Sequence, residues 1–338
     1  MSVRVGIMSF AHVHAPQYAG VLSSLDAADF VGLADDNASR GREAADKFGV
    51  RFFEGARGLF EAVDAVVICS ENRRHARDTV AALESGVHVL CEKPISTTTD
   101  DAVAMIRTSE GTGRQLGTAF PVRYLPAVKQ AKEIVRSGGI GRVLAINGTN
   151  HGQMPGGWFL DPELAGGGAV MDHTVHLADA LRWMLGTEVK NVYAEVGTFF
   201  GADGIDDAAI LTLELEGGAI ADGAFATIDP SWSRGKGYPT WGDVTLRITG
   251  TAGVLNVDAF AQHLTTFDHE AGSTSWTYTG EDMNLLMLED FLRGVAEGSQ
   301  AGASGVDGLR ALEIVLAAYR SAEDNEAKEV ERTEAAGR

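Results

Sequence analysis

Residues 3–14, VRVGIMSFAHVH, join a short apolar segment to a loop of small and polar side chains. The apolar run Val3–Met8 predicts a buried strand. The loop after it lies where dinucleotide-binding proteins carry the pattern G-x-G-x-x-G, but Ser9, Ala11 and His14 occupy the three glycine positions. A small residue in the middle still lets a phosphate approach the backbone. The loop alone leaves two alternatives open, a dinucleotide site or an ordinary strand-to-helix turn with two surface histidines.

The next hundred or so residues alternate apolar runs with amphipathic stretches. Runs that predict further buried strands are Phe30–Asp35, Ala65–Ser70, Val87–Glu92 and Gln115–Phe120. Helices are predicted between them at Arg40–Phe48, Arg73–Gly86 and Asp100–Gly113. This alternation predicts an α/β fold with a doubly wound parallel sheet, which binds its ligands beyond the carboxyl ends of the strands.

The pattern changes after about residue 143. Alternating segments predict a mainly antiparallel sheet from Asn191–Phe199, Ala208–Glu216, Ala219–Ile228, Val244–Thr249, Gly253–Asp258 and His263–Phe267. Helices are predicted at Leu125–Ser137, His173–Leu185, Met283–Glu297 and Val306–Ala322. The polar tail from Asp324 is expected to fray. Two closely packed domains with a cleft between them follow from the change of pattern.

Composition narrows the class of protein. The 338 residues carry 28 basic and 47 acidic side chains, a formal net charge of −19. Such a surface repels nucleic acid and anionic membranes. The two cysteines, Cys69 and Cys91, cannot build a disulfide framework or a four-thiolate zinc site, and they are expected as buried thiols on neighbouring strands. Without a signal-peptide pattern or an apolar run of about 20 residues, we expect a cytoplasmic enzyme with no nucleic-acid or membrane partner.

Two carboxylates follow the second predicted strand. Asp35 lies where a carboxylate would accept hydrogen bonds from the adenosine ribose hydroxyls of a dinucleotide. Asp36 beside it would repel a 2′-phosphate and so favours NAD over NADP. Arg40 and Arg42 lie close enough in the sequence to reverse that preference. The structural alternative is a cluster that caps the following helix.

Two further motifs carry acid–base chemistry. Cys91–Pro94 closes the fourth predicted strand and puts Lys93 at the ligand-binding edge of the sheet, unless its stem merely covers the strand end. Downstream of Gly166–Gly168, Asp172 and His176 are four residues apart and share one face of a predicted helix. A carboxylate there can orient an imidazole that acts as a general base. The alternative is a helix cap and a buried histidine.

These motifs resemble the Gfo/Idh/MocA family of NAD(P)-dependent oxidoreductases over nearly the whole chain. The ordered set is Asn72 with His75, Cys91–Pro94, Arg123 with Pro126, Gly138–Gly141, Gly166–Gly168 with Asp172, His176 and Asp179, and Gly250–Gly253. The resemblance implies a Rossmann domain at 1–122 that binds the dinucleotide. It also implies an α/β domain at 123–338 that binds substrate through an open, mainly antiparallel sheet and forms a homodimer or homotetramer. The glycine loop departs from the family, as does Thr174, where a glycine is frequent.

The resemblance also implies site residues, with Lys93, Asp172 and His176 as the catalytic set. Together with the loop and the second strand, the predicted cofactor-binding residues are Ser9, Phe10, Ala11, His12, Asp35, Asp36, Ser70, Asn72, His75, Glu92 and Lys93. Candidate substrate contacts are Arg123, Trp158 and His173, with packing as the alternative for Trp158 and a polar helix start as the alternative for His173. No metal ligand set is expected.

The predicted reaction is oxidation of a secondary hydroxyl of a sugar, polyol or cyclitol, or the reverse. His176 would take the hydroxyl proton, Lys93 would stabilise charge on the oxygen, and Asp172 would orient His176. The loop Trp232–Lys236 adds an aromatic ring and two cations, which would also suit a carboxylated or phosphorylated sugar. Three alternatives stay open: a transient-redox glycosidase or epimerase, a non-catalytic NAD-binding sensor, and a metal hydrolase. The last would be built on His12, His14, His151, His173 and His176.

Overall fold

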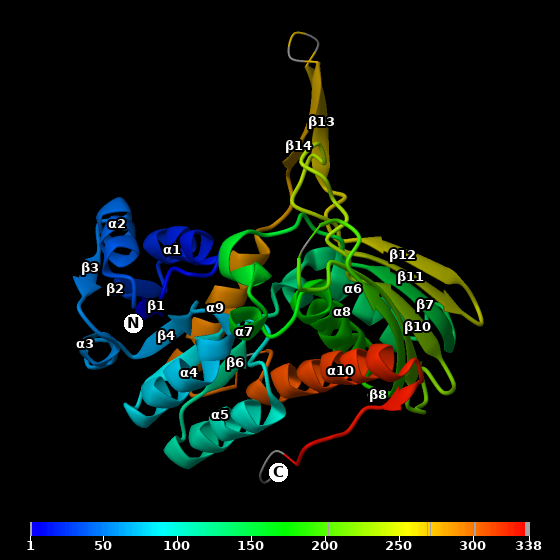
Figure 1. The fold of residues 1–338 in the computed structure, drawn as a ribbon, viewed down its shortest axis with the longest axis horizontal. Coiled ribbons are helices and arrows are strands. Elements are labelled where there is room, and N and C mark those ends of the chain that lie inside the picture. The colour runs from blue at the N-terminus through cyan, green and yellow to red at the C-terminus, as the bar shows by residue number, and fades with distance from the viewer. Residues whose placement is uncertain (1, 202, 269, 271, 301, 335–338) are drawn as a thin grey trace.

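The computed structural model describes residues 2–334 of the chain, apart from 202, 269, 271 and 301. These residues form two large sheets with helices packed against them and a two-stranded hairpin that projects away from both (Figure 1). The parallel sheet comes from the first third of the sequence and the mixed sheet from the rest. No helix in the described part of the chain is long and apolar enough to cross a bilayer.

The first sheet confirms the predicted doubly wound architecture. Its described strands are all parallel, in the order β3-β2-β1-β4-β5-β6. They are β1 (Val3–Met8), β2 (Ala28–Ala34), β3 (Arg51–Phe53), β4 (Ala65–Ile68), β5 (His88–Cys91) and β6 (Leu116–Thr118). The strand order reverses between β1 and β4, so the crevice beyond their carboxyl ends is the expected ligand site.

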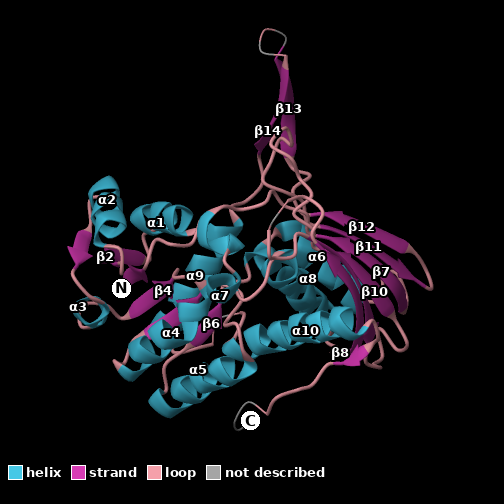
Figure 2. Ribbon diagram, in the orientation of Figure 1, coloured by secondary structure: helices cyan, strands magenta, loops and turns pink. Residues whose placement is uncertain are grey.

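Helices lie on both faces of this sheet (Figure 2). They are α1 (Ala15–Ser24), α2 (Ala38–Phe48), α3 (Ala56–Phe60), α4 (His75–Glu84) and α5 (Thr99–Thr112). The predicted helices match α2, α4 and α5, whereas α1, α3 and the short edge strand β3 were given no bounds. Cys69 and Cys91 are buried free thiols beside the paired strands β4 and β5, as predicted.

The second sheet is mixed. Its described strands follow the order β12-β11-β7-β10-β9-β8-β15, antiparallel except for the β7–β10 pair. They are β7 (Val143–Thr149), β8 (Val189–Gly197), β9 (Ala208–Leu215), β10 (Phe225–Asp229), β11 (Thr245–Gly250), β12 (Val254–Asp258) and β15 (Lys328–Glu329). The helices α6 (Pro126–Arg136), α8 (Ala169–Leu185) and α10 (Gly305–Asp324) cover one face of this sheet (Figure 2). The mainly antiparallel prediction is confirmed.

Two local predictions are wrong, and one strand was missed. β10 begins at Phe225 rather than Ala219, the tail after α10 does not fray at Asp324, and β7 was not predicted. Instead, β15 pairs with β8, and the nearby Val330 is only 7% exposed. Pairing with a strand far away in the sequence stabilises this tail, so its polar composition gave no indication of it.

The helix α8 begins at Ala169, four residues before the predicted start. Its first N–H groups are capped from a distance: Gly168 N and Val170 N donate to the Asp206 carboxylate over 2.9 and 2.8 Å. Ala169 N donates to the Asp206 carbonyl over 3.0 Å. Asp172 therefore lies inside the first turn, and the alternative that it caps the helix is wrong.

The two parts of the chain pack on each other. The helix α9 (Met283–Glu297), whose bounds were predicted, places Phe291 and Leu292 in the same buried cluster as Val5 and Ile7 of β1. The N–H of Thr118 at the end of β6 also donates to Ala303 O over 3.0 Å. The division into 1–122 and 123–338 stays a prediction, while the sheets themselves are joined by a shared core.

A hairpin of β13 (His263–Asp268) and β14 (Ser273–Tyr278) projects from the side of the molecule that carries the mixed sheet (Figure 1). The first strand was predicted and the second was not. An isolated two-stranded hairpin is marginally stable in water. Aromatic side chains at its base contact one another, and they also line the cavity described next.

Candidate active site

A cavity of about 530 Å³ lies between the carboxyl ends of β1 and β5, the helix α8 and the base of the hairpin. Its lining includes all three predicted catalytic residues, Lys93, Asp172 and His176. The predicted substrate contact His173 and the loop residue His12 line it as well. Residues predicted separately from distant motifs are therefore brought together at one site.

Lys93 is held in the cavity wall by Asp172. Its Nζ lies 2.5 Å from Asp172 Oδ1 and 3.2 Å from the Asp172 carbonyl oxygen, and both residues are buried. Burial alone would raise the pKa of Asp172, but the charge of Lys93 outweighs it and holds that pKa well below its ordinary value. An ammonium group has three donors, so Lys93 keeps one N–H for a further oxygen.

The second oxygen of Asp172 is held by residues from two other segments. Trp232 Nε1 donates to Asp172 Oδ2 over 3.1 Å, and His173 Nε2 lies 3.2 Å from the same oxygen. Trp232 is fully buried and does not line the cavity, so the predicted stacking face is wrong and Trp232 positions Asp172 instead. Among the described residues no hydrogen bond joins Asp172 to His176, so the predicted orientation of His176 by direct contact is absent.

His176 faces the cavity as a neutral base. It is 8% exposed, and its Nδ1 is buried without a hydrogen-bond partner among the described residues. Burial, and then the nearby charge of Lys93, lower the pKa of His176 well below its ordinary value. The ring is therefore uncharged at neutral pH and able to accept a proton.

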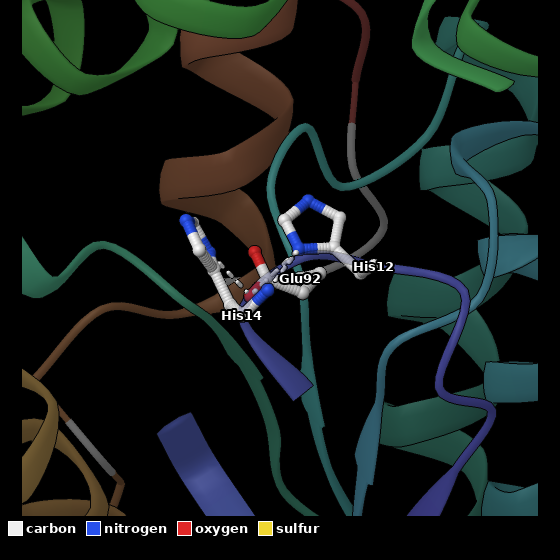
Figure 3. A group of neighbouring side chains, drawn as sticks. All are labelled: His12, His14 and Glu92. Carbon is white, nitrogen blue, oxygen red and sulfur yellow. Dashed lines mark hydrogen bonds and ion pairs between the residues drawn. The ribbon is translucent and has the colours of Figure 1, made fainter. Parts of the chain in front are cut away.

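Two loop histidines converge on Glu92 at the end of β5 (Figure 3). His14 Nδ1 lies 2.9 Å from Glu92 Oε1, and His12 Nδ1 lies 3.6 Å from the same oxygen. The His14 N–H also donates to His12 Nδ1 over 3.2 Å. Burial lowers the pKa of His12 to about 3, so its ring is neutral and carries its proton on Nε2. That Nε2 is buried without a partner among the described residues, which leaves a free donor at the cavity wall.

This histidine–carboxylate group could also offer ligand atoms to a metal ion, since three such atoms lie within 4.8 Å of one another. The larger metal site considered as an alternative is not assembled. His151 is held by Asp229 and Asp243 at 3.0 and 2.9 Å, and His173 by Asp172 and the Pro230 carbonyl. Two of the five histidines proposed for a hydrolase therefore have other partners.

The loop after β1 has a glycine-like backbone conformation at one position where the dinucleotide-binding pattern has glycine. Ser9 has a φ of 71°, in the left-handed region that favours glycine. The Phe10 N–H donates to Asp35 Oδ2 over 2.7 Å, and the Ala11 N–H to Ser9 Oγ over 3.2 Å. Two of the N–H groups that a phosphate would use in a glycine-rich loop therefore already have acceptors.

The carboxylates after β2 are paired with arginines. Arg40 lies 2.7 Å from Asp35 and 3.1 Å from Asp36, and Arg74 is in contact with Asp36. Arg42 instead pairs with Glu54, so it is Arg74 rather than Arg42 that joins Arg40 beside the predicted ribose site.

Polar atoms without partners follow β4. Ser70 Oγ and Asn72 Oδ1 are buried and have no hydrogen-bond partner among the described residues, while Asn72 Nδ2 donates to Ala165 O over 2.9 Å. His75 is fully buried, with its ring nitrogens 2.8 Å from Pro94 O and 3.1 Å from Ser70 O. It braces the two loops that carry Lys93 and Asn72 and does not line the cavity.

Two predicted substrate contacts lie elsewhere. Arg123 is 4% exposed, and its Nε lies 2.6 Å from Asp179 Oδ2, with a second contact to Asp307 at 2.9 Å. A buried, bidentate ion pair of this kind leaves the guanidinium unavailable to a substrate. Trp158 donates from Nε1 to Ala11 O over 2.9 Å and stacks on Phe159, so it covers the loop after β1. Phe159, rather than Trp158, lines the cavity.

A charged cluster in the cavity wall was not predicted. His151 lies between Asp229 and Asp243, and these carboxylates outweigh burial and raise the pKa of His151 to about 9. Arg234 donates to Asp243 from Nε over 3.0 Å. The four residues come from β10 and two loops, so their spacing in the sequence gave no motif.

Two protein-family models and several known dehydrogenases match this chain. Residues 3–120 match the model of an oxidoreductase family with an NAD-binding Rossmann fold, and residues 128–256 match the GFO/IDH/MocA C-terminal domain. Myo-inositol 2-dehydrogenase of Thermotoga maritima is 29% identical over 97% of this chain and 99% of its own length. D-glucoside 3-dehydrogenase of Escherichia coli is 30% identical over 64% of this chain and 68% of its own.

Solved structures agree on the fold. The crystal structure of a probable dehydrogenase from Thermotoga maritima superposes with a TM-score of 0.83 at 27% identity, covering 97% of this chain and 99% of the other. Levoglucosan dehydrogenase in complex with NADH and levoglucosan has a TM-score of 0.83 at 23% identity, covering 98% of this chain and all of its own. The second likeness shows the fold alone.

Proposed function

Since this chain belongs to the GFO/IDH/MocA family of NAD-binding oxidoreductases, we propose that it oxidises a secondary hydroxyl of a neutral sugar, polyol or cyclitol, or reduces the matching ketone. The observation that carries the proposal is the Lys93–Asp172 ion pair beside the neutral His176 in one cavity. Oxidation of an alcohol removes a proton from the hydroxyl oxygen and a hydride from its carbon. A fixed cationic donor can stabilise charge on that oxygen, and a neighbouring base can accept the proton.

A neutral substrate is favoured because the cations at the cavity already have carboxylate partners. Lys93 is paired with Asp172, and His151 with Asp229 and Asp243. Arg234 is also bonded to Asp243, within the same cluster. A carboxylated or phosphorylated sugar would have to break one of these pairs, which costs more than hydrogen-bonding a hydroxyl.

The residues at the carboxyl edge of the first sheet fit a dinucleotide. Three buried polar atoms there lack partners among the described residues: His12 Nε2, Ser70 Oγ and Asn72 Oδ1. A buried polar group without a partner is costly. Of the three residues only His12 lines the cavity, where its Nε2 could donate to a bound ligand. NAD, when bound, supplies the hydride-accepting ring. The preference for NAD over NADP stays a prediction, because Arg40 and Arg74 are paired with the two carboxylates that would repel the extra phosphate.

The chain's own residues manage the proton. In the oxidation direction His176 accepts the proton of the substrate hydroxyl. The carbon that carries this hydroxyl loses a hydride to the nicotinamide ring, so the alcohol becomes a ketone. The remaining N–H of Lys93 donates to the reacting oxygen and stabilises negative charge on it. Asp172, fixed by Trp232 and His173, holds Lys93 in place through their ion pair. Asp172 acts on His176 through its negative charge, which raises the pKa of His176, and not through a hydrogen bond among the described residues.

Oligomerisation through the second sheet forms part of this proposal. Large apolar side chains lie exposed on four neighbouring strands: Leu144 on β7, Phe225 on β10, Ile210 on β9 and Tyr193 on β8. A row of this kind on the face away from the helices suits a self-complementary contact in a homodimer or homotetramer. Light scattering on the purified protein measures the mass, and a monomer at micromolar concentration would contradict this part. The cytoplasmic location stays a prediction.

The test is a spectrophotometric screen of polyols, cyclitols and sugars with NAD, followed by variants of the site. We expect NADH formation with at least one of these compounds. His176→Ala should lower turnover about 10²–10⁴-fold, and Lys93→Met should lower it at least as much. Lys47→Met, an exposed lysine on α2, is the matched control and should leave turnover unchanged. Full turnover in both site variants would contradict the proposed roles.

A further inference from the structure

Part of the cavity wall, formed by other segments than the acid–base residues, is aromatic. Five rings line it: Trp241 from the loop before β11, Phe260 from the turn after β12, His263 from β13, and Trp276 and Tyr278 from β14. No lysine, arginine or carboxylate side chain belongs to this set. The cavity is thus lined by the acid–base residues Lys93, Asp172 and His176 and also by a group of aromatic rings.

Four of these five rings, all except Trp241, contact another ring. His263 stacks on Trp276 with centroids 4.4 Å apart and an interplanar angle of 25°. Tyr238 meets Trp276 edge-on at 5.8 Å, and Phe260 meets Tyr278 edge-on at 6.2 Å. Arg234 lies over the Tyr238 ring at 4.3 Å, which connects this wall to the charged cluster around His151. A wall of interlocked rings offers a preorganised surface at low entropic cost.

The rings are not used as core. Trp241 is 52% exposed and Tyr278 38% exposed, whereas a packing tryptophan such as Trp232 is 2% exposed. Of the five, only Phe260 packs against the main buried cluster. Exposed aromatic faces that border a cavity are typical of ligand-binding grooves, and they bind apolar surfaces and the C–H faces of sugar rings.

We propose that this aromatic wall is a second subsite, which binds the aglycone or the second ring of a glycoside while the oxidised ring lies against Lys93 and His176. The preferred substrate is then a glycoside rather than a free monosaccharide or cyclitol. This rests on the proposed dehydrogenase function, which it deepens by naming the substrate class. The rings and the acid–base residues line the same cavity, so one ligand can reach both.

The test compares matched pairs of probes on the NAD-loaded protein: phenyl β-D-glucopyranoside against glucose, and phenyl β-D-galactopyranoside against galactose. Calorimetry measures binding, and NADH formation measures turnover. We expect at least one phenyl glycoside to bind ten times or more tightly than its free sugar. Equal affinity within both pairs, or no detectable binding of either glycoside, would overturn the subsite.

Variants locate the effect. Trp276→Ala should remove most of the tenfold difference while leaving the affinity for the free sugar and for NADH unchanged, and Trp276→Phe should restore it. Phe267→Ala, at an exposed position further along the same hairpin, is the matched control and should leave both affinities unchanged. If Trp276→Ala weakens glycoside and free sugar equally, the wall supports the fold and the subsite is refuted.

The two proposals fail in different ways. Glycoside binding that depends on Trp276, without NADH formation from any compound, would support the subsite and contradict the dehydrogenase function. NADH formation from free sugars and cyclitols with no preference for glycosides would support the dehydrogenase function and overturn the subsite.

Discussion

Replacing Arg123 separates a structural role from the substrate contact that the sequence suggested. Arg123 is 4% exposed, its Nε lies 2.6 Å from Asp179 Oδ2, and its Nη1 donates to Gly302 O over 2.7 Å. In Arg123→Met the 1% exposed carboxylate of Asp179 keeps its burial and loses its main cation. Removing one partner of a buried pair costs about 3–5 kcal/mol, because an uncompensated charge is left behind.

Thermal and urea unfolding measure this cost. Arg123→Met should melt on the order of 10 °C below the wild type, and lower pH should reduce the difference, because protonation neutralises the buried Asp179. Asp179→Asn added to this variant should recover part of the loss. Arg57→Met, which breaks a solvent-exposed pair with Glu61, is the control and should not shift the melting temperature. An unchanged melting temperature with a raised KM for the sugar would refute this reasoning and return Arg123 to the substrate site.

Three further outcomes follow from the site. In the oxidation direction kcat/KM should stay constant from pH 8 to 6.5 and fall only at lower pH, because burial lowers the pKa of His176. A decrease of kcat/KM that already begins above pH 6.5 as the pH is lowered would contradict this. Asp229 and Asp243 raise the pKa of His151 to about 9, so its charge should stabilise the fold fully below pH 6.5 and lose that contribution as the pH rises through 9. The melting temperatures of wild type and His151→Gln should therefore converge between pH 6 and 10. A constant difference would argue against a charged His151. Trp232→Phe should lower kcat about tenfold or more with unchanged affinity for NADH, because a hydrogen bond to a charged group is worth about 1.5–3 kcal/mol; an unchanged kcat would show that Asp172 does not need Trp232.

The parts of the fold that depend on local patterns were predictable. Each strand of the first sheet except β3 was expected within two residues of its bounds, and α9 was expected with its observed bounds. A parallel strand buried on both faces is a continuous apolar run, and a helix packed on one face repeats its apolar residues every three or four positions. β3 has only three residues, of which one is exposed, so it lacks a run long enough to recognise.

The features that were missed depend on contacts distant in the sequence. The start of α8 is fixed by Asp206, 38 residues after Gly168, and β15 exists because β8 lies beside it. The same holds in the site. Lys93, Asp172 and His176, predicted from their motifs, line one cavity, and their catalytic roles stay a prediction. Trp232 and His151 instead have partners that only the fold brings near them. Arg123 was misassigned because a sequence does not show that Asp179 and Asp307 already hold it.

The central claim is that the altered loop after β1 still binds a dinucleotide for hydride transfer. Calorimetric titration of nucleotide-free protein with NADH and, separately, with NADPH tests it directly. The account predicts micromolar binding of NADH, with weaker binding of NADPH if the carboxylates of Asp35 and Asp36 outweigh the arginines paired with them. Tighter binding of NADPH would reverse the cofactor assignment and indicate that Arg40 and Arg74 read the phosphate. If neither nucleotide binds, the loop that carries Ser9, Ala11 and His14 has lost the site, and the dehydrogenase function is contradicted.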